Sequence, residues 1–261
     1  MKKCRLILIL NLGVVFLIAI SANAHMLWLT PESNAVSVGE SVQIEIGFGH
    51  EYPHGKMEKK GMLASVYAVA PDGTEIDAEA TSPSTYTFTP EQEGIYRIYS
   101  ALKPGFVSNT VSGRKLGNKQ SLENVVDCFA YRISAVTAIR CGQSEAGEAK
   151  RGNPELDIVP VRDPANLGKG DTLALKVLFK GKPLAGASIT PAAAAHHHGG
   201  GHSHGHGHSH NANVETDSDG IARIKLKSDG WWLFTARHQM PYPDRDKCDS
   251  YSYSTSLTIE F

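Results

Sequence analysis

Short runs in which polar and apolar residues alternate recur along this chain, and they constrain its fold more than any other feature. The run Ser41–Phe48 alternates as a half-buried strand does, and the apolar run Leu63–Ala70 ends at the turn Pro71–Gly73. Similar runs follow, and no segment has the period of a convincing amphipathic helix. Short strands separated by frequent turns predict an all-β sandwich fold.

The strand pattern is interrupted near the middle of the chain. Residues 143–153 are rich in Gly, Glu, Ala and Lys, which is a composition typical of a linker. We therefore expect two β-sandwich domains, immunoglobulin-like or prealbumin-like, over residues 25–142 and 154–261. A histidine-rich loop, residues 191–213, is predicted to be inserted in the second domain.

The first 24 residues have the organisation of a secretory signal peptide. Basic residues precede the apolar run Leu6–Ile20, and Ala22–Ala24 forms a small-residue cleavage site. The alternative is an uncleaved membrane anchor, and the shortness of the apolar run argues against it. Cleavage after Ala24 would make His25 the first residue of a protein exported to the periplasm. No other segment approaches the roughly 20 apolar residues that span a bilayer.

The charge balance excludes some classes of partner. Removing Lys2, Lys3 and Arg5 from the 26 basic residues leaves 23 against 27 acidic residues, a net charge of about −4 with histidine neutral. Nucleic acid and anionic membrane surfaces both need a basic patch, so neither is an expected partner. The chain also lacks the phosphate-loop and C-x-x-C motifs, so no nucleotide or flavin site is predicted, and no catalytic residue is predicted.

Three cysteines follow the signal segment, so one disulfide and one free thiol is the simplest arrangement in an oxidising compartment. If Cys128 and Cys141 lie on one extended strand, they are roughly 40 Å apart at about 3.3 Å per residue. A disulfide needs Cα atoms within about 7 Å. Cys248 is therefore the expected partner of one of them, with Cys141 favoured.

An internal tract holds eight of the twelve histidines, interleaved with glycine and serine. Nothing in it is apolar, and imidazole is a ligand that suits Ni, Zn, Cu and Co, so the composition predicts metal binding. An expression tag would normally be an unbroken run at a terminus, and a solvated low-complexity loop is the other alternative. We expect an exposed insertion. Its histidines are His196, His197, His198, His202, His204, His206, His208 and His210.

The segment His50–His54 matches H-E-x-x-H, the zinc-protease signature in which a helix places two histidines on one face. Pro53 lies inside the segment and glycines flank it on both sides, and both residue types oppose a helix. We interpret the segment as a strand end that enters a loop, and not as a protease site. His50 and His54 stay candidate metal ligands, with His50 favoured because it directly follows the predicted strand.

His25 would carry a free α-amino group beside its imidazole after cleavage. The amine, with a reference pKa near 8, and a ring nitrogen can chelate one metal ion together. One or two further histidines would complete the arrangement called a histidine brace. The alternative is a fraying terminus. Because the apolar segment Met26–Leu29 is expected to dock as a strand, His25 is a candidate metal ligand.

His238 follows a buried-looking strand, Trp231–Arg237. A lone histidine at a strand end is more often a structural residue than a ligand. Tyr242, Asp244 and Asp246 nearby offer oxygen ligands, or acceptors for imidazole N–H groups, and a solvated loop explains them equally well. His238 is kept as a candidate metal ligand with this structural alternative open.

Several motifs of the chain resemble those of one protein family. The matching segments are Ala24–Pro31, Gly47–His50, Gly152–Pro160, Asp163–Pro164, Gly168–Asp171, Gly181–Ala187, Thr216–Gly220 and Gly230–His238. They are similar to those of a family of exported bacterial proteins labelled as periplasmic components of cobalt or nickel uptake systems. The resemblance implies two β-sandwich domains and a periplasmic role in handling metal. The cysteines and the histidine tract depart from the family pattern.

These observations favour a non-enzymatic protein that binds a divalent transition metal, first of all Ni²⁺ or Co²⁺, and supplies it to the components of an inner-membrane uptake system. A copper or zinc chaperone or buffer is an alternative of the same class. A copper-dependent oxidative enzyme with a histidine brace is an alternative of another class, as is an adhesion module without stoichiometric metal. In the favoured hypothesis the tract collects ions, while His25, His50 and His238 form an ordered site.

Overall fold

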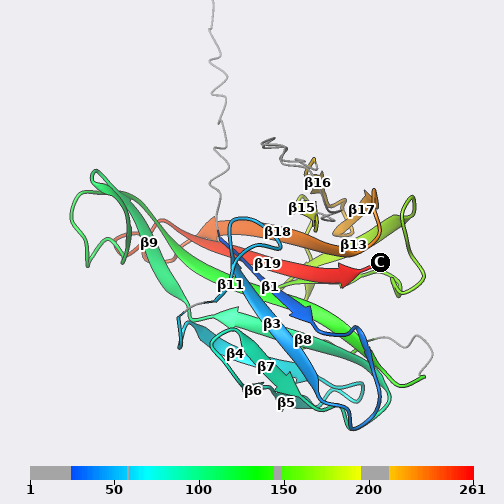
Figure 1. The fold of residues 1–261 in the computed structure, drawn as a ribbon. Helices are drawn as coiled ribbons and strands as arrows, with labels where there is room; N and C mark the ends of the chain where they lie inside the picture. Colours follow the sequence, from blue (N-terminus) through cyan, green and yellow to red (C-terminus); the bar gives the residue numbers. More distant parts are fainter. Residues whose placement is uncertain (1–24, 58, 144–148, 195–211) are drawn as a thin grey trace, which may run out of the picture.

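The computed structural model describes residues 25–57, 59–143, 149–194 and 212–261, and these ranges form an all-β structure (Figure 1). They contain no helix, and hence no helix that could cross a membrane. The predicted signal segment and the eight histidines of the tract lie outside the described residues. The all-β fold predicted from the alternating pattern is confirmed.

Nineteen strands form within these ranges. In chain order they are β1 (Met26–Pro31), β2 (Ala35–Val36), β3 (Val42–Gly49), β4 (Leu63–Val69), β5 (Glu75–Asp77), β6 (Glu79–Ala80), β7 (Thr85–Phe88), β8 (Gly94–Leu102), β9 (Gly105–Thr110), β10 (Gly113–Leu116), β11 (Val125–Cys141), β12 (Leu156–Pro160), β13 (Thr172–Phe179), β14 (Lys182–Pro183), β15 (Ser188–Ala193), β16 (Val214–Glu215), β17 (Ile221–Lys225), β18 (Trp231–Pro241) and β19 (Ser250–Glu260).

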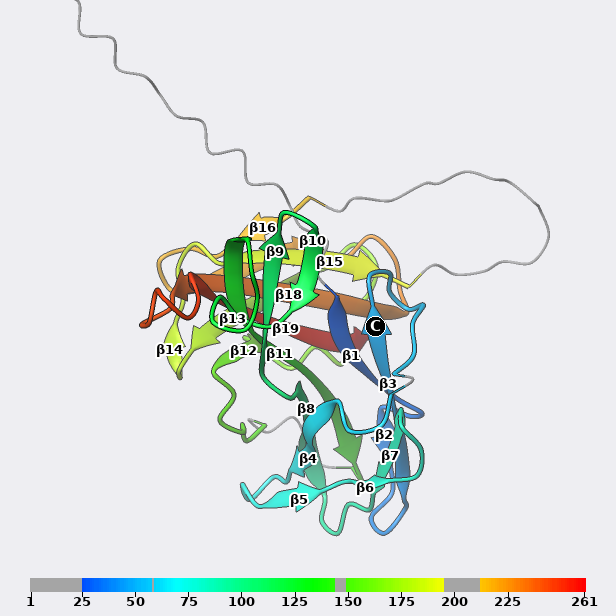
Figure 2. The ribbon, with the colours of Figure 1, turned by 90° about the vertical axis from the view of Figure 1, so that its left-hand side faces the viewer.

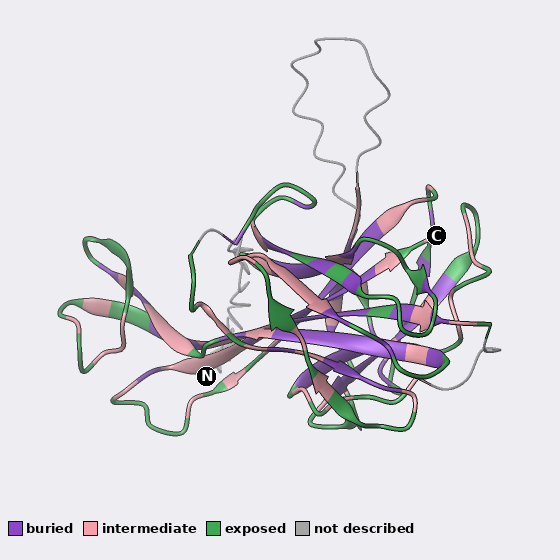
Figure 3. Cartoon of the chain, turned by 60° about the horizontal axis from the view of Figure 1, so that its bottom comes forward, coloured by how far each residue is buried: buried purple, intermediate pink, exposed green. Residues whose placement is uncertain are grey.

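The alternation of the sequence is visible in the burial of individual strands. Along β3, Val42, Ile44 and Ile46 are buried while the residues between them are exposed, as the pattern of Ser41–Phe48 predicts. Buried residues run along the strands, and most exposed residues lie in the loops (Figure 3). In β3, a local period of two residues therefore decides which side faces the core.

The strands form three sheets. A large sheet of eleven strands has the order β16-β15-β18-β19-β11-β8-β4-β5, with β2, β9 and β10 attached beside this path. One sheet of four strands has the order β1-β3-β7-β6, and the other combines β12, β13, β14 and β17. The two smaller sheets cover different parts of the large one, so the large sheet is shared by two sandwiches.

Each sandwich has its own apolar core. The first core joins side chains of β1 and β3 to those of β4, β8 and β11, with Leu27, Ile44 and Ile98 fully buried. The second core joins β12, β13 and β17 to β15, β18 and β19, around Trp232 and Phe234. The predicted segments 25–142 and 154–261 supply most of the first and second core respectively, while the boundary at 143–153 stays a prediction.

Strands β11 and β19 connect the two sandwiches. They pair in parallel from Phe129 with Ser250 to Thr137 with Thr258, although they are more than a hundred residues apart in the sequence. Strand β11 also pairs with β8 and β9. Figure 2 shows the strands β4 to β7 below this junction and the strands β15, β16 and β18 above it. The hairpin of β9 and β10 projects away from the body of the molecule (Figure 1).

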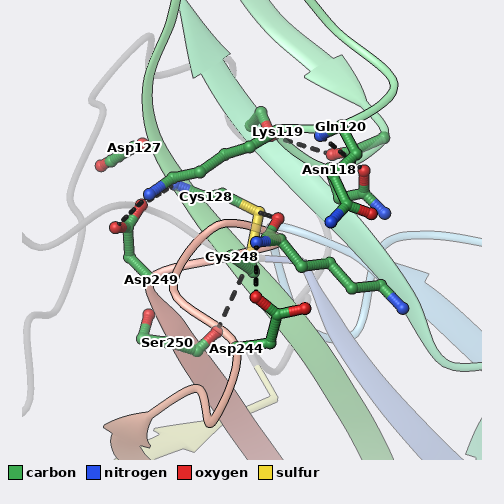
Figure 4. The surroundings of a disulfide bond; sticks show 12 residues. Asn118, Lys119, Gln120, Asp127, Cys128, Asp244, Cys248, Asp249 and Ser250 are labelled. Carbon is green, nitrogen blue, oxygen red and sulfur yellow. Dashed lines mark hydrogen bonds and ion pairs between the residues drawn. A yellow bond between two sulfur atoms is a disulfide. The ribbon is translucent and has the colours of Figure 1, made fainter.

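The disulfide joins Cys128 to Cys248 (Figure 4). Cys141 is buried and free. The expectation that Cys141 is the favoured partner is wrong. The reason is the register of β11 and β19: Cys248 precedes Ser250, which lies beside Phe129 at the start of β11. Cys141 lies at the other end of the same strand. The expectation that Cys128 and Cys141 do not bond to each other is confirmed.

Candidate metal centre

Strand pairing at the start of the first sandwich brings two predicted ligands together. Met26 on β1 lies opposite Gly49 on β3, so His25 and His50 are the next residues of two antiparallel strands at the same edge. Leu27 and Leu29 are fully buried and hold β1 in place. Both histidines are exposed at this edge. The prediction that Met26–Leu29 docks as a strand is confirmed.

The two imidazole rings are in direct contact. The Nε2 atom of His50 lies 2.8 Å from the Nδ1 atom of His25, a hydrogen-bond distance whose donor depends on the tautomers. The ring centroids are 3.8 Å apart, and the ring of His25 also stacks on Phe48 at 4.9 Å. Two nitrogen ligands about 2.0–2.1 Å from one metal ion lie about 2.8–3.4 Å apart at angles of roughly 90–110°. The pair is therefore close to the spacing that a shared ion requires.

The electrostatics of the pair favour the form of imidazole that binds metal. Partial desolvation of the His25 ring lowers its pKa, and the charges of His50 and Arg114 lower it further. A lowered pKa favours the neutral ring, whose nitrogen lone pair is available to an ion. Arg114 is on β10, in the projecting hairpin, and nothing in the sequence indicates that it lies near His25.

Aromatic residues support the edge on which the pair lies. Trp28 is 3% exposed and meets the ring of Tyr52 edge-on, with centroids 5.6 Å apart. Tyr52 is itself buried, which anchors the loop that follows His50. Gly55 has a φ of 143° and lies so close to Phe48 that an added Cβ would be 2.8 Å from the Phe48 carbonyl oxygen. Backbone freedom at this glycine lets the loop close against β3.

The H-E-x-x-H segment is a loop and contains no helix, as predicted from its proline and flanking glycines. His50 directly follows β3, and His54 lies exposed in the loop beyond it. The geometry that a zinc protease needs, two histidines one turn apart on a helix face, is therefore lacking in this segment.

His238 lies on β18 and belongs to a different environment. Its ring packs against Phe179, with centroids 4.6 Å apart, and stacks on Tyr253 at 6.2 Å. Burial lowers the pKa of His238. His238 is not part of the hydrogen-bonded pair of His25 and His50. Its contacts are those of a structural residue beside the second core. Within the described ranges, no group of three or more His, Cys, Asp or Glu side chains is arranged to hold a metal ion.

The last described residues before the histidine tract pack on a small aromatic cluster beside β1. Ala192 and Ala194 pack against a cluster that contains Met26, Trp28 and Tyr52. Ala194 also donates a backbone hydrogen bond to Trp231. The last described residue before the tract is thus anchored in the same cluster as β1.

The fold and the site define an all-β protein of two sandwiches with a histidine pair at the edge of its first sheet. The chain belongs to the family described as "Domain of unknown function (DUF4198)", which matches residues 22–240. A search of curated proteins found no match.

Similar solved structures include immunoglobulin-like and fibronectin-like proteins. The D0-D1 domain of intimin is 10% identical, with 89% of this chain and 97% of that chain covered and a TM-score of 0.23. The fibronectin(III)-like modules of Clostridium thermocellum CbhA are 10% identical, with coverages of 89% and 94% and a TM-score of 0.20. Murine CEACAM1b is 10% identical, with coverages of 91% and 98% and a TM-score of 0.21.

Proposed function

We propose that this chain is an exported protein that binds a divalent transition metal ion through His25 and His50. The observation that carries the proposal is the 2.8 Å distance between Nδ1 of His25 and Nε2 of His50. The rings are exposed, held by paired strands, and spaced for one ion. Imidazole nitrogens suit Ni²⁺, Co²⁺, Cu²⁺ and Zn²⁺.

Two imidazoles alone make a weak site, and the α-amino group of His25 is the third ligand in this proposal. The amine becomes available when the chain is cut after Ala24. Of the two ring nitrogens of His25, only Nδ1 can close a six-membered chelate ring with the amine of the same residue. Nδ1 is also the nitrogen that lies against His50. The identity of this atom supports a chelate that includes the terminus.

We extend this proposal to the supply of Ni²⁺ or Co²⁺ to an inner-membrane uptake system. This extension rests on the family resemblance of the sequence motifs. Affinity alone will not identify the metal, because sites of nitrogen ligands prefer Cu²⁺ in the Irving–Williams order. A role in copper or zinc buffering is separated from nickel supply by growth of a deletion strain under nickel limitation and under copper or zinc stress. Collection of ions by the histidine tract is proposed from composition only.

A copper-dependent oxidative activity is the second candidate, and the orientation of His25 Nδ1 toward His50 is the observation that favours it. The amine and two imidazoles are the ligand set of a histidine brace. Release of hydrogen peroxide by the copper form, absent after His25→Ala, would support this candidate.

The ordered site is best tested in a variant that lacks residues 196–210, because the tract would otherwise dominate the titration. Calorimetry with Ni²⁺ and Cu²⁺ on the chain starting at His25 is expected to give one ion per chain. His50→Ala, and separately one extra alanine in front of His25, are expected to abolish stoichiometric binding, since each removes one ligand.

His238→Ala is the matched control, because its ring packs against Phe179 and Tyr253, and it is expected to retain the ion. Absence of bound metal in the variant without the tract would refute the ordered site. Binding that survives His50→Ala would assign the ion to other ligands.

A further inference from the structure

A cavity of about 630 Å³ lies between the two sandwiches, and neither His25 nor His50 lines it. Its walls come from β8 and β11 of the first half, from the segment that follows β12, and from the end of β19. The volume is in the range of sites that hold small molecules. The position is also typical, because such sites often form where two structural units meet.

Four arginines line this cavity. Arg97 pairs with Asp157, and Arg140 pairs with Asp163. The other two arginines, Arg151 and Arg162, are exposed and make no hydrogen bond or salt bridge with any described residue. Two carboxylates also line the cavity: Asp163 is the partner of Arg140, and Glu260 accepts a hydrogen bond from the Asn34 amide. The lining therefore has an excess of positive charge.

One of these arginines has a buried N–H group that lacks an acceptor. Arg97 is 3% exposed, and its Nη2 atom donates to the Asp157 carboxylate and to the Ile158 carbonyl oxygen. Its Nε–H group is buried without any hydrogen-bond partner. A buried unpaired donor costs stability, more so when it is charged. Because Arg97 lines the cavity, an anion bound there is a candidate acceptor for this group.

The remaining wall is largely apolar. Ile95 from β8, Val159 and Val161 near the end of β12, and Leu257 from β19 all face the same space. A small inorganic anion would satisfy the arginines and leave this apolar surface without contacts. A ligand with an anionic head and a short hydrocarbon body matches both parts of the lining.

We propose that this cavity binds a small organic carboxylate, with the carboxylate at the arginines and the hydrocarbon body against the apolar wall. Guanidinium groups bind carboxylates through paired, charge-assisted hydrogen bonds. Arg151 and Arg162 supply the accessible charge, and Arg97 supplies the buried donor. The site is separate from the histidine pair, so it stands whether or not that pair binds metal.

Hexanoate is the test ligand, and hexanamide is its neutral counterpart of the same shape. Calorimetry at constant ionic strength is expected to show binding of hexanoate and at least about tenfold weaker binding of hexanamide, because the charged hydrogen bonds are lost. The Arg97 Nε–H resonance in a nitrogen-edited NMR spectrum is expected to shift on addition of hexanoate.

The double variant Arg151→Gln/Arg162→Gln is expected to bind hexanoate at least about tenfold more weakly, without loss of folding, since both arginines are exposed and neither makes a hydrogen bond or salt bridge with a described residue. Arg223→Gln is the control, because Arg223 is an exposed arginine on β17 outside the cavity. Equal binding of hexanoate and hexanamide, or unchanged binding in the double variant, would overturn the proposal. Inorganic phosphate that binds as tightly as hexanoate would overturn the assignment of an organic ligand.

Discussion

Gly47 shows how one residue without a side chain controls the surroundings of the histidine pair. It lies opposite Trp28 in the ladder of β1 and β3. A Cβ atom at this position would be 2.0 Å from the indole Nε1 and Cε2 atoms of Trp28. The indole therefore occupies space that any other residue at position 47 would need. Trp28 in turn contacts Tyr52, which anchors the loop after His50.

The variant Gly47→Ala is expected to lower the free energy of unfolding by about 1–3 kcal/mol, because the indole must move out of a well-packed position. It is also expected to weaken metal binding at His25 and His50. Urea unfolding and metal titration measure the two effects. Gln43→Ala, on the exposed side of the same strand, is the control and is expected to change stability by no more than about 0.5 kcal/mol. A Gly47→Ala protein as stable as this control would contradict the argument.

At the scale of elements, β11 connects parts of the molecule that are distant in the sequence. No local sequence pattern predicts these connections. Its 17 residues pair with β8, β9 and β2 of the first half and with β19 of the second. The disulfide between Cys128 and Cys248 links the β11 start to the loop before β19, beside the Lys119–Asp249 salt bridge (Figure 4). The covalent link and the parallel ladder therefore enforce the same register.

Replacement of both bonded cysteines, Cys128→Ser with Cys248→Ser, is expected to destabilise the protein by about 2–4 kcal/mol. The link closes a loop with a sequence separation of 120 residues, and its loss increases the conformational freedom of the unfolded chain. Thermal unfolding measures the difference. Alkylation of the exported protein in denaturant without reductant is expected to label Cys141 alone. Labelling of all three cysteines would show that the disulfide does not form.

At the scale of the whole molecule, a buried ion pair joins the two halves. Arg97 on β8 and Asp157 on β12 are both nearly inaccessible, and their side chains meet at 3.1 Å. Burial raises the pKa of Asp157, although Arg97 and Arg151 oppose this effect. The second carboxylate oxygen of Asp157 has no hydrogen-bond partner, so the pair is incompletely satisfied. Such a pair contributes more to the relative position of the two sandwiches than to the free energy of unfolding.

Asp157→Ala is expected to cost about 3–5 kcal/mol, because Arg97 is left buried without its counter-charge. The double variant Arg97→Met/Asp157→Leu is expected to be more stable than Asp157→Ala, since it removes both charges from the interior. Chemical unfolding of the three proteins gives the comparison. A double variant less stable than the single one would show that the ion pair makes a net contribution to stability.

The sequence by itself determined the features that depend on neighbouring residues. The alternation along Ser41–Phe48 predicts the buried and exposed sides of β3, and Pro53 with its flanking glycines predicts that His50–His54 is not a helix. These predictions are confirmed because side chains two residues apart share one side of a strand, and because proline and glycine act on their own backbone.

Only the tertiary structure decided which distant segments meet. The sequence marks His25 and His50 as candidates, but their contact depends on the register of β1 against β3. The choice of Cys128 over Cys141 depends on the parallel pairing of β11 with β19. The cavity lined by arginines is formed by residues of both halves of the chain, and no sequence motif predicts it. Register between strands is set by the packing of whole faces, which a local pattern of residues does not contain.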